Sequence, residues 1–275
     1  MTLLKLKELE KYLYNRKLAI EFILEKPRKK FSASTFHKLR VEIKKLNALF
    51  DLLSTCTESF NRKKTFKPFK IIFRQAGIVR ELQLEETLLK NFKLISLLSD
   101  YMISIRKNRL TEQRVFFSMI DIKMNDRIKN KYKLIVPFLS SVNKLNSENY
   151  LNEKTISIKK IINRTNIQAE QIHELRKLLK MVSYIRKCLS SEKYNDPESK
   201  NHKLSGLLGK WHDLQVMIRH LNKAIDTGEI NKDEIILLKK IKAKISSDSY
   251  NLFEKIKKAI SESEFFTGNK QQYMY

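Results

Sequence analysis

Apolar residues recur along nearly the whole chain at steps of three and four, the spacing of one face of an α-helix. In segment 34–55 these positions are Leu39, Ile43, Leu46, Phe50 and Leu53. In segment 166–190 they are Leu175, Leu179, Val182 and Leu189. The alternation typical of strands is scarce, and only five Gly and four Pro occur in 275 residues. We therefore predict an all-α protein.

Breaks in this pattern mark the expected helix boundaries. Ser34 is the expected N-cap of the second helix, and Asn125-Asp126 should open a segment that Pro137 interrupts. The predicted helices span about residues 2–25, 34–55, 66–92, 97–124, 138–164, 166–190, 197–226 and 231–262. Residues 263–275 are expected to form a flexible C-terminal tail.

The order of these helices contains an internal repeat. Gly77 and Gly209 each stand four residues before an acidic side chain, Glu81 or Asp213, and Leu-Gln follows in both copies. Each glycine lies a similar distance after a histidine of the preceding helix. We therefore predict two four-helix units, about residues 1–125 and about 130–262, each with its own core.

The second helix of each unit carries the same basic groups in the same order. Positions i, i+3 and i+7 lie within about 60° of one another around an α-helix. Each helix therefore has one polar stripe of matching composition. The stripes are His37, Arg40 and Lys44 in the first unit, and His173, Arg176 and Lys180 in the second.

The charge of the chain indicates a polyanionic partner. It holds 56 Lys and Arg against 30 Asp and Glu, a formal net charge of +26, and both halves are basic.

The two cysteines, Cys56 and Cys188, have no metal-ligand spacing, and no signal peptide or membrane-spanning apolar run is recognisable. A reduced, cytoplasmic setting without membrane contact is the expectation.

These motifs, in this order, resemble the CHAD domain, the conserved histidine α-helical domain. The resemblance rests on two His-x-Leu-Arg-x-x-x-Lys stretches and two Gly-x-x-x-[Asp/Glu]-Leu stretches, and it makes residues 1–262 one CHAD-like domain. It implies two pseudo-symmetric four-helix bundles whose motif helices line a basic central groove or pore. It also implies binding of inorganic polyphosphate without catalysis or a cofactor, and we expect an association with polyphosphate granules.

Polyphosphate offers charge and oxygen atoms but no bases, so the candidate site consists of cationic donors. Arg suits bidentate contacts, Lys acts as a mobile charge, and His adds a donor that titrates near neutrality. The first-rank candidates are His37, Arg40, Lys44, His173, Arg176 and Lys180. The second-rank candidates are Lys45, Arg74, Arg80, Lys177 and Lys210. Further contributions are expected from Arg106, Arg109, Arg114, Lys239 and Lys240 on the fourth helix of each unit.

The other repeated residues are interpreted as structural. Gly77 and Gly209 are expected to permit close approach of two helices, because glycine inside a helix otherwise costs about 1 kcal/mol relative to alanine. Glu81 and Asp213 are expected to orient a motif His or Arg. The remaining histidines, His202, His212 and His220, are assigned no role in binding.

Some positions depart from the family's pattern. The motif helices usually carry a further Arg or Lys where this chain has Asn47 and Ser183, and the acid of the first glycine motif is Glu81 where Asp is usual. His212 stands where the first unit has Arg80. These departures bear on affinity and on preferred chain length.

Three other functions fit parts of the sequence. Net charge alone allows weak, nonspecific nucleic-acid binding. Single-strand binding, however, requires aromatic residues interleaved with the cations, and the Phe and Tyr residues here mostly fall at core positions. A metal-dependent polyphosphate phosphohydrolase needs clustered ligands, and the chain has no phosphate loop or nucleophile elbow. A purely structural scaffold leaves the repeated cations unexplained.

Overall fold

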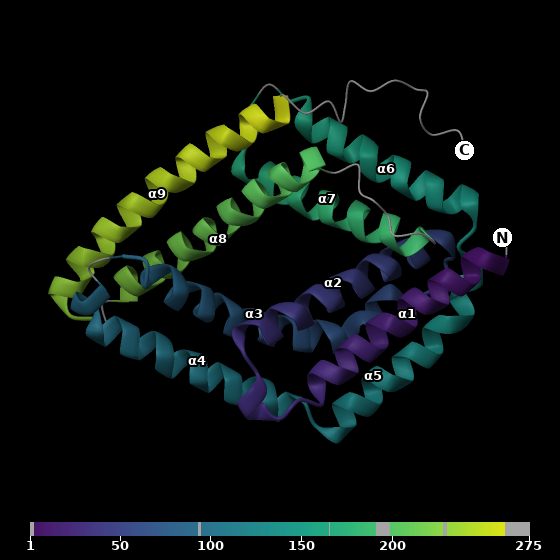
Figure 1. The fold of residues 1–275 in the computed structure, drawn as a ribbon, viewed down its shortest axis with the longest axis horizontal. Helices are drawn as coiled ribbons and strands as arrows, with labels where there is room; N and C mark the ends of the chain where they lie inside the picture. The colour runs from purple at the N-terminus through teal and green to yellow at the C-terminus, as the bar shows by residue number, and fades with distance from the viewer. Residues whose placement is uncertain (1–2, 93–94, 165, 191–198, 228–229, 262–275) are drawn as a thin grey trace.

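The computed structural model describes residues 3–92, 95–164, 166–190, 199–227 and 230–261 (Figure 1). The helices are α1 (Leu3–Leu24), α2 (Ala33–Cys56), α3 (Arg62–Leu89), α4 (Ser99–Met119), α5 (Ile122–Ile135), α6 (Lys144–Ile162), α7 (Ala169–Leu189), α8 (Ser199–Thr227) and α9 (Lys232–Ser261). Short 3₁₀ turns occupy Arg28–Lys30, Ile95–Leu97 and Val136–Ser141. These ranges contain no strand, so the all-α prediction is confirmed.

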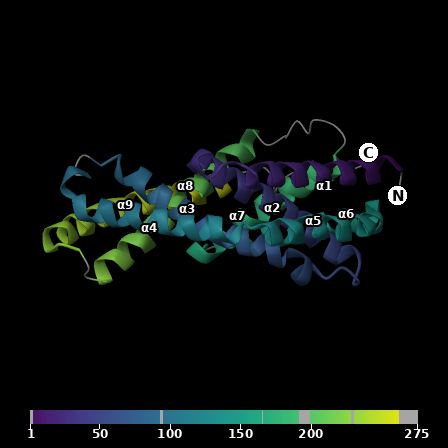
Figure 2. The same ribbon diagram turned by 90° about the horizontal axis from the view of Figure 1, so that it is seen from below.

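The helices form a flat molecule with the motif helices inside it. Figure 1 shows α2, α3, α7 and α8 in the middle, with α4, α5, α6 and α9 around the outside. The view from below shows how thin the molecule is in the third direction (Figure 2). The sequence motifs therefore lie on the four helices nearest the centre.

The start of α2 differs from the prediction. Its N-cap is Ser32, whose hydroxyl accepts a hydrogen bond from the Thr35 amide at 3.3 Å, so the assignment to Ser34 was wrong. The Thr35 hydroxyl in turn accepts from the Ser32 amide at 3.4 Å. This reciprocal capping box needs a partner three residues after the cap, and Thr35 provides it for Ser32.

The predicted helix 97–124 ends early, at Met119. Asp121 caps α5 by accepting from the Met124 amide at 2.6 Å, so the new segment opens before Asn125-Asp126. Pro137 interrupts the helical run as expected, because it lies in the 3₁₀ turn Val136–Ser141 between α5 and α6.

The apolar core forms three clusters that do not follow the boundary between the predicted units. One cluster surrounds α1, α2, α3 and α5 and also takes in Tyr150 of α6 and Ile185 and Cys188 of α7. A second joins α6, α7, α8 and α9. The third packs Leu89 and Tyr101 of the first half against residues of α8 and α9. Two separate four-helix bundles are thus not confirmed, and the internal symmetry stays a prediction.

Buried polar contacts also join distant parts of the chain. Glu234 of α9 accepts hydrogen bonds from the amides of Asp100 and Tyr101 at the start of α4, both at 2.8 Å. Asp51 of α2 accepts from the Tyr150 hydroxyl at 2.7 Å. These carboxylates satisfy donors that would otherwise be buried alone, and they fix how the elements of the two halves sit.

Asp51 has two cationic partners as well. Lys154 of α6 lies 3.2 Å from its Oδ2, and Arg62 at the start of α3 donates to its Oδ1.

The part of the chain that the structure describes has no helix that is apolar enough and long enough to span a bilayer.

Candidate anion-binding site

The two matched stripes come together in one place. Burial lowers the pKa of Lys44 to about 8, and neighbouring Arg40 adds to that shift. Arg176 and Lys180, which belong to α7, lower the pKa of Lys44 further. Because the interaction of charges weakens with distance, these effects require the stripes of α2 and α7 to lie close together.

Residues of α3 and α8 complete the surroundings. Burial raises the pKa of the Asp213 carboxyl, and this effect exceeds the lowering by Arg176 and Arg80. His37 and Lys44 also lower the pKa of Asp213. A carboxyl group of α8 therefore lies among positive groups of α2, α3 and α7. We refer to Arg40, Lys44, Arg80, Arg176 and Lys180 as the cation cluster.

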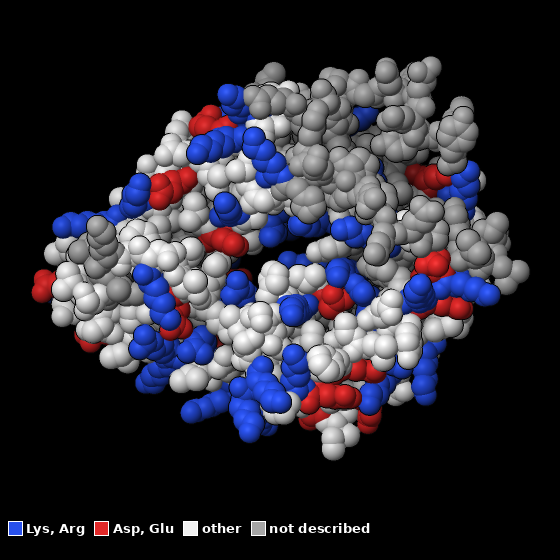
Figure 3. Space-filling model, in the orientation of Figure 1, with Lys and Arg blue, Asp and Glu red and all other residues white. Residues whose placement is uncertain are grey.

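Figure 3 shows a hollow near the middle of this face of the molecule, with Lys and Arg side chains along its rim. Figure 1, in the same orientation, shows α2 and α3 on one side of the centre and α7 and α8 on the other. Positively charged side chains therefore lie around a concave part of this face.

Arg40 is held in a fixed orientation. Its Nη1 donates a hydrogen bond to the Phe73 carbonyl at 2.8 Å, and its guanidinium lies 4.2 Å from the centre of the Phe73 ring. Burial is the main reason why its pKa is lowered. Guanidinium has five N–H donors, so one bond to Phe73 leaves others for a ligand.

Gly77 provides the room for this arrangement. A Cβ atom at Gly77 would collide with the Arg40 guanidinium, so the close contact at this glycine is with a side chain. At Gly209 a Cβ atom would meet nothing within 4 Å. The predicted role in close approach of two helices was therefore wrong for Gly209, whereas at Gly77 a side chain of α2 uses the room, so the two copies differ.

Arg176 of α7 has a different environment from Arg40. Its Nε is buried and, within the ranges that the structure describes, has no hydrogen-bond partner. Burial lowers its pKa, and Asp213 raises it. A buried N–H without an acceptor costs about 1–3 kcal/mol.

His173 and His212 lie face to face. Their ring centres are 5.1 Å apart and the ring planes differ by 31°. Burial lowers the pKa of both, that of His212 to about 4, so both rings are neutral near pH 7. Sequence reasoning missed His212, although its position three residues after Gly209 matches that of Arg80 after Gly77 and was a usable signal.

His37, the motif histidine of α2, is more exposed to solvent than His173 and His212. Burial still lowers its pKa, and the charge of Arg80 is the next cause. Each motif histidine therefore lies near the residue three positions after the glycine of the following helix: His37 is near Arg80, and His173 is near His212.

Comparisons with known proteins place this geometry in a known fold. A scan with models of protein families finds no match, and a search of curated proteins also finds none. The crystal structure of the CHAD domain from the plant Ricinus communis is similar, with a TM-score of 0.77 and 13% sequence identity. The match covers 94% of this chain and 92% of the plant domain.

The chain has a CHAD-like fold. At this identity the likeness concerns the fold, and function has to be argued from the site itself. In the CHAD-like fold described here, the repeated motifs occupy the inner helices and contribute to one shared cluster of charges. The resemblance seen in the sequence is confirmed at the level of fold.

Several second-rank candidates have other surroundings in this CHAD-like structure. Lys45 pairs with Glu42 at 2.8 Å, on the side of α2 that faces Arg16 of α1. Lys210 lines a cavity of about 470 Å³ between α8 and α9, which Asp213 also lines. Arg106 and Arg109 pair with Glu86 at 3.4 Å and 3.2 Å. The candidates of second rank and on the fourth helices that are exposed to solvent are Arg74, Arg106, Arg114, Lys177, Lys210, Lys239 and Lys240, and the first-rank Lys180 is exposed as well. Lys177 is near enough to His173 to lower its pKa.

Glu81, expected to orient a motif residue, has a different hydrogen-bond partner. Its Oε2 lies 3.4 Å from Nε2 of His220, although its charge still raises the pKa of Arg40.

His202 lies outside the residues whose side chains are described. In the described ranges no group of three or more His, Cys, Asp or Glu is arranged to hold a metal ion.

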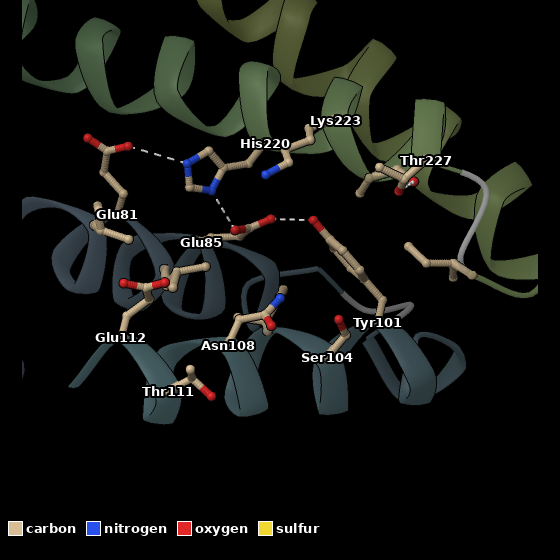
Figure 4. Close-up of a pocket in the computed structure, with 15 residues that line it drawn as sticks. Glu81, Glu85, Tyr101, Ser104, Asn108, Thr111, Glu112, His220, Lys223 and Thr227 are labelled. Carbon is tan, nitrogen blue, oxygen red and sulfur yellow. Dashed lines mark hydrogen bonds and ion pairs between the residues drawn. The ribbon is translucent and has the colours of Figure 1, made fainter. Parts of the chain in front are cut away.

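A cavity of about 540 Å³ lies beside the cation cluster, between α3, α4 and α8 (Figure 4). Nδ1 of His220 lies 2.6 Å from Oε2 of Glu85, and the Tyr101 hydroxyl donates to the other Glu85 oxygen. Hydrogen bonds to Glu81 and Glu85 raise the pKa of His220 to about 9. The ring is therefore charged near pH 7, and its charge is balanced by carboxylates of α3. This cavity is lined by acidic side chains, Glu81, Glu85 and Glu112, together with apolar ones, unlike the cation cluster.

Proposed function

We propose that this protein binds inorganic polyphosphate along the cation cluster, without catalysing a reaction. The single observation that supports this most is that Arg40 of α2 and Arg176 and Lys180 of α7 lie close enough to Lys44 to add to the lowering of its pKa by burial. Crowded cations repel one another, and a chain of phosphates would replace that repulsion with attraction. The CHAD-like fold agrees with what the resemblance implied.

The proposed roles follow from the chemistry of each side chain. Arg40 and Arg176 make bidentate contacts to phosphate oxygens. Lys44 and Lys180 neutralise charge, and His37 and His173 donate hydrogen bonds. A flexible phosphate chain can pass from one stripe to the other, whereas a small anion can occupy only one of them.

Binding should be measured by titration with polyphosphates of graded length at several salt concentrations. Affinity should rise with chain length until both halves are occupied, and it should fall steeply with salt because bound counterions are released. The double variant Arg40→Ala with Arg176→Ala should lose at least tenfold in affinity, about 1.4 kcal/mol or more. Its helix content and melting temperature should change little.

A matched control removes two positive charges elsewhere. Arg127 and Lys129 are exposed on α5, on the outside of the molecule, and Arg127→Ala with Lys129→Ala gives the same change in net charge. This control should bind nearly as well as the original protein. If both double variants lose affinity equally, binding depends on general charge and the proposed site is wrong.

Two rival functions are tested in the same experiments. At fixed ionic strength, long polyphosphate should displace nucleic acid much more efficiently than nucleic acid displaces polyphosphate; the reverse result would favour nucleic-acid binding. Release of phosphate from polyphosphate by the pure protein, with or without added divalent metal, would identify an enzyme instead.

We further propose that this binding brings the protein to polyphosphate granules in the cytoplasm. A fluorescent fusion should gather at the granules, and the fusion carrying Arg40→Ala with Arg176→Ala should stay dispersed. Equal gathering of both fusions would contradict recruitment through the cation cluster.

A further inference from the structure

The two halves differ at one matched position that faces the site. Arg80 stands three residues after Gly77 on α3, and His212 stands three residues after Gly209 on α8. Each is next to the motif histidine of its own half: Arg80 lowers the pKa of His37, and the ring of His212 lies on that of His173. The first half therefore has a permanent charge where the second half has an imidazole.

The surroundings of the His173–His212 pair are mostly positive. Lys44 of α2, Arg176 and Lys177 of α7 and Arg219 of α8 lower the pKa of one ring or both. Glu81 of α3 has the opposite effect on His212, but it is the smallest of the causes. Without an anion, a proton on either ring would be placed among these cations.

A bound phosphate changes that balance. Its oxygens accept hydrogen bonds from a protonated ring and compensate the charges of Lys44 and Arg176, which oppose protonation. Both rings are partly accessible, so a ligand at Arg176 can reach them. The proton comes from solvent, and no other group needs to lose one.

We propose that His212 is a phosphate-binding residue in the second half of the site, and that the His173–His212 pair takes up a proton when polyphosphate binds. The inference rests on the proposed function, and it adds that the two halves bind by different means. In the first half, Arg80 keeps its charge across this pH range, so the position that matches His212 adds no pH dependence there. The second half binds it best in mildly acidic conditions.

The size of the effect follows from linkage. Burial is the main reason why the pKa of His212 is lowered. If the charge of a bound phosphate and its hydrogen bond to the ring offset burial and the neighbouring cations, so that the pKa rises to about 6.5, affinity rises about tenfold between about pH 8 and about pH 5.5. His212→Arg gives the second half a permanent charge. This variant should therefore bind polyphosphate more tightly than the original protein at about pH 8, and its affinity should no longer show the rise toward acidic pH that His212 causes. His212→Gln keeps a donor but cannot be protonated, and it should also lose the rise.

The reciprocal change is Arg80→His, which makes the first half resemble the second. This variant should show a steeper pH dependence than the original protein. Because the end groups of polyphosphate titrate in the same range, long chains should be used and all variants compared on the same ligand at the same ionic strength. Thermal melting of each variant confirms that the folded protein is being compared.

Calorimetry supplies an independent measurement. Titration in buffers with different ionisation enthalpies gives the number of protons taken up on binding. That number should be smaller for His212→Arg and His212→Gln than for the original protein. Equal proton uptake in all three, or an unchanged pH profile in both variants, would overturn the inference while leaving polyphosphate binding intact. Failure of the original protein to bind at low salt and mildly acidic pH would instead refute the proposed function.

Discussion

The guanidinium of Arg40 occupies the space that a side chain at Gly77 would need. The glycine lies on α3 and the arginine on α2, and the same guanidinium donates to the Phe73 carbonyl one turn before the glycine. Gly77 of the glycine motif thus makes room for the cation of the histidine motif, Arg40, to point toward α3. The second half has the same two residue types but no such contact at Gly209.

Replacing this glycine separates binding from stability. Gly77→Ala should displace the Arg40 side chain and weaken polyphosphate binding about tenfold, or about 1.4 kcal/mol. The better helix propensity of alanine, about 1 kcal/mol, should partly offset the lost hydrogen bond. Urea unfolding and polyphosphate titration measure the two effects.

Gly209→Ala is the matched control, because a methyl group there meets nothing. It should raise stability by up to about 1 kcal/mol and leave affinity unchanged. Equal losses of affinity in both alanine variants would show that Gly77 has no special relation to Arg40.

His220 should stabilise the protein in a pH-dependent way. Its pKa in the folded protein, about 9, is above the ordinary value, so its contribution is complete below about pH 6.5 and is lost as the pH rises through about 9. His220→Gln should therefore cost about 2–3 kcal/mol near neutral pH. The two proteins should converge in stability at alkaline pH, as measured by urea unfolding at each pH. A constant difference would mean that the charge of His220 is unimportant.

Lys44 should give polyphosphate binding a second pH dependence, on the alkaline side. Its pKa is about 8 in the free protein, and a bound polyanion should return it toward its ordinary value. Affinity should therefore fall as the pH rises above about 8, and Lys44→Arg should reduce that fall because guanidinium stays charged. Titrations above neutral pH test this, with melting curves to confirm that each protein is folded. If affinity falls above about pH 8 by the same amount in Lys44→Arg, a group other than Lys44 causes the pH dependence.

Glu234 should contribute to stability far from the cation cluster. Its carboxylate accepts from two amides at the start of α4, and Glu234→Gln keeps its size but removes the charge and one acceptor. The expected cost is about 1–3 kcal/mol in urea unfolding, with little effect on binding. Asp233→Asn, at the exposed neighbouring position, is the control and should cost much less. Equal costs would mean that general charge at this helix end is responsible.

The faces of the motif helices could be predicted because helix phase alone decides which residues share a side. His37, Arg40 and Lys44 are bound to form one stripe once the segment is helical. What the sequence could not provide was the partner of each side chain. The contact of Arg40 with Gly77 depends on a rotamer, and the pairing of Lys45 with Glu42 depends on where α1 packs.

Local competition explains the other differences. Ser32 and Ser34 are both good caps, and the choice between them depends on a bond that Thr35 can make to only one. Asp121 ended a run of helical sequence because a single capping bond to Met124 was sufficient. His212 was overlooked because histidine at a position held by arginine in the other copy was interpreted as a loss of charge.

The apolar cluster that joins Leu89 and Tyr101 to α8 and α9 has a consequence for selectivity. Together with Ile185 and Cys188, which anchor α7 in the core of the first half, it fastens the two halves to each other at separate places. Such a frame resists opening or closing, because packed cores deform little. We expect the partner to do the bending, which favours a thin, pliable anion over a stiff double helix.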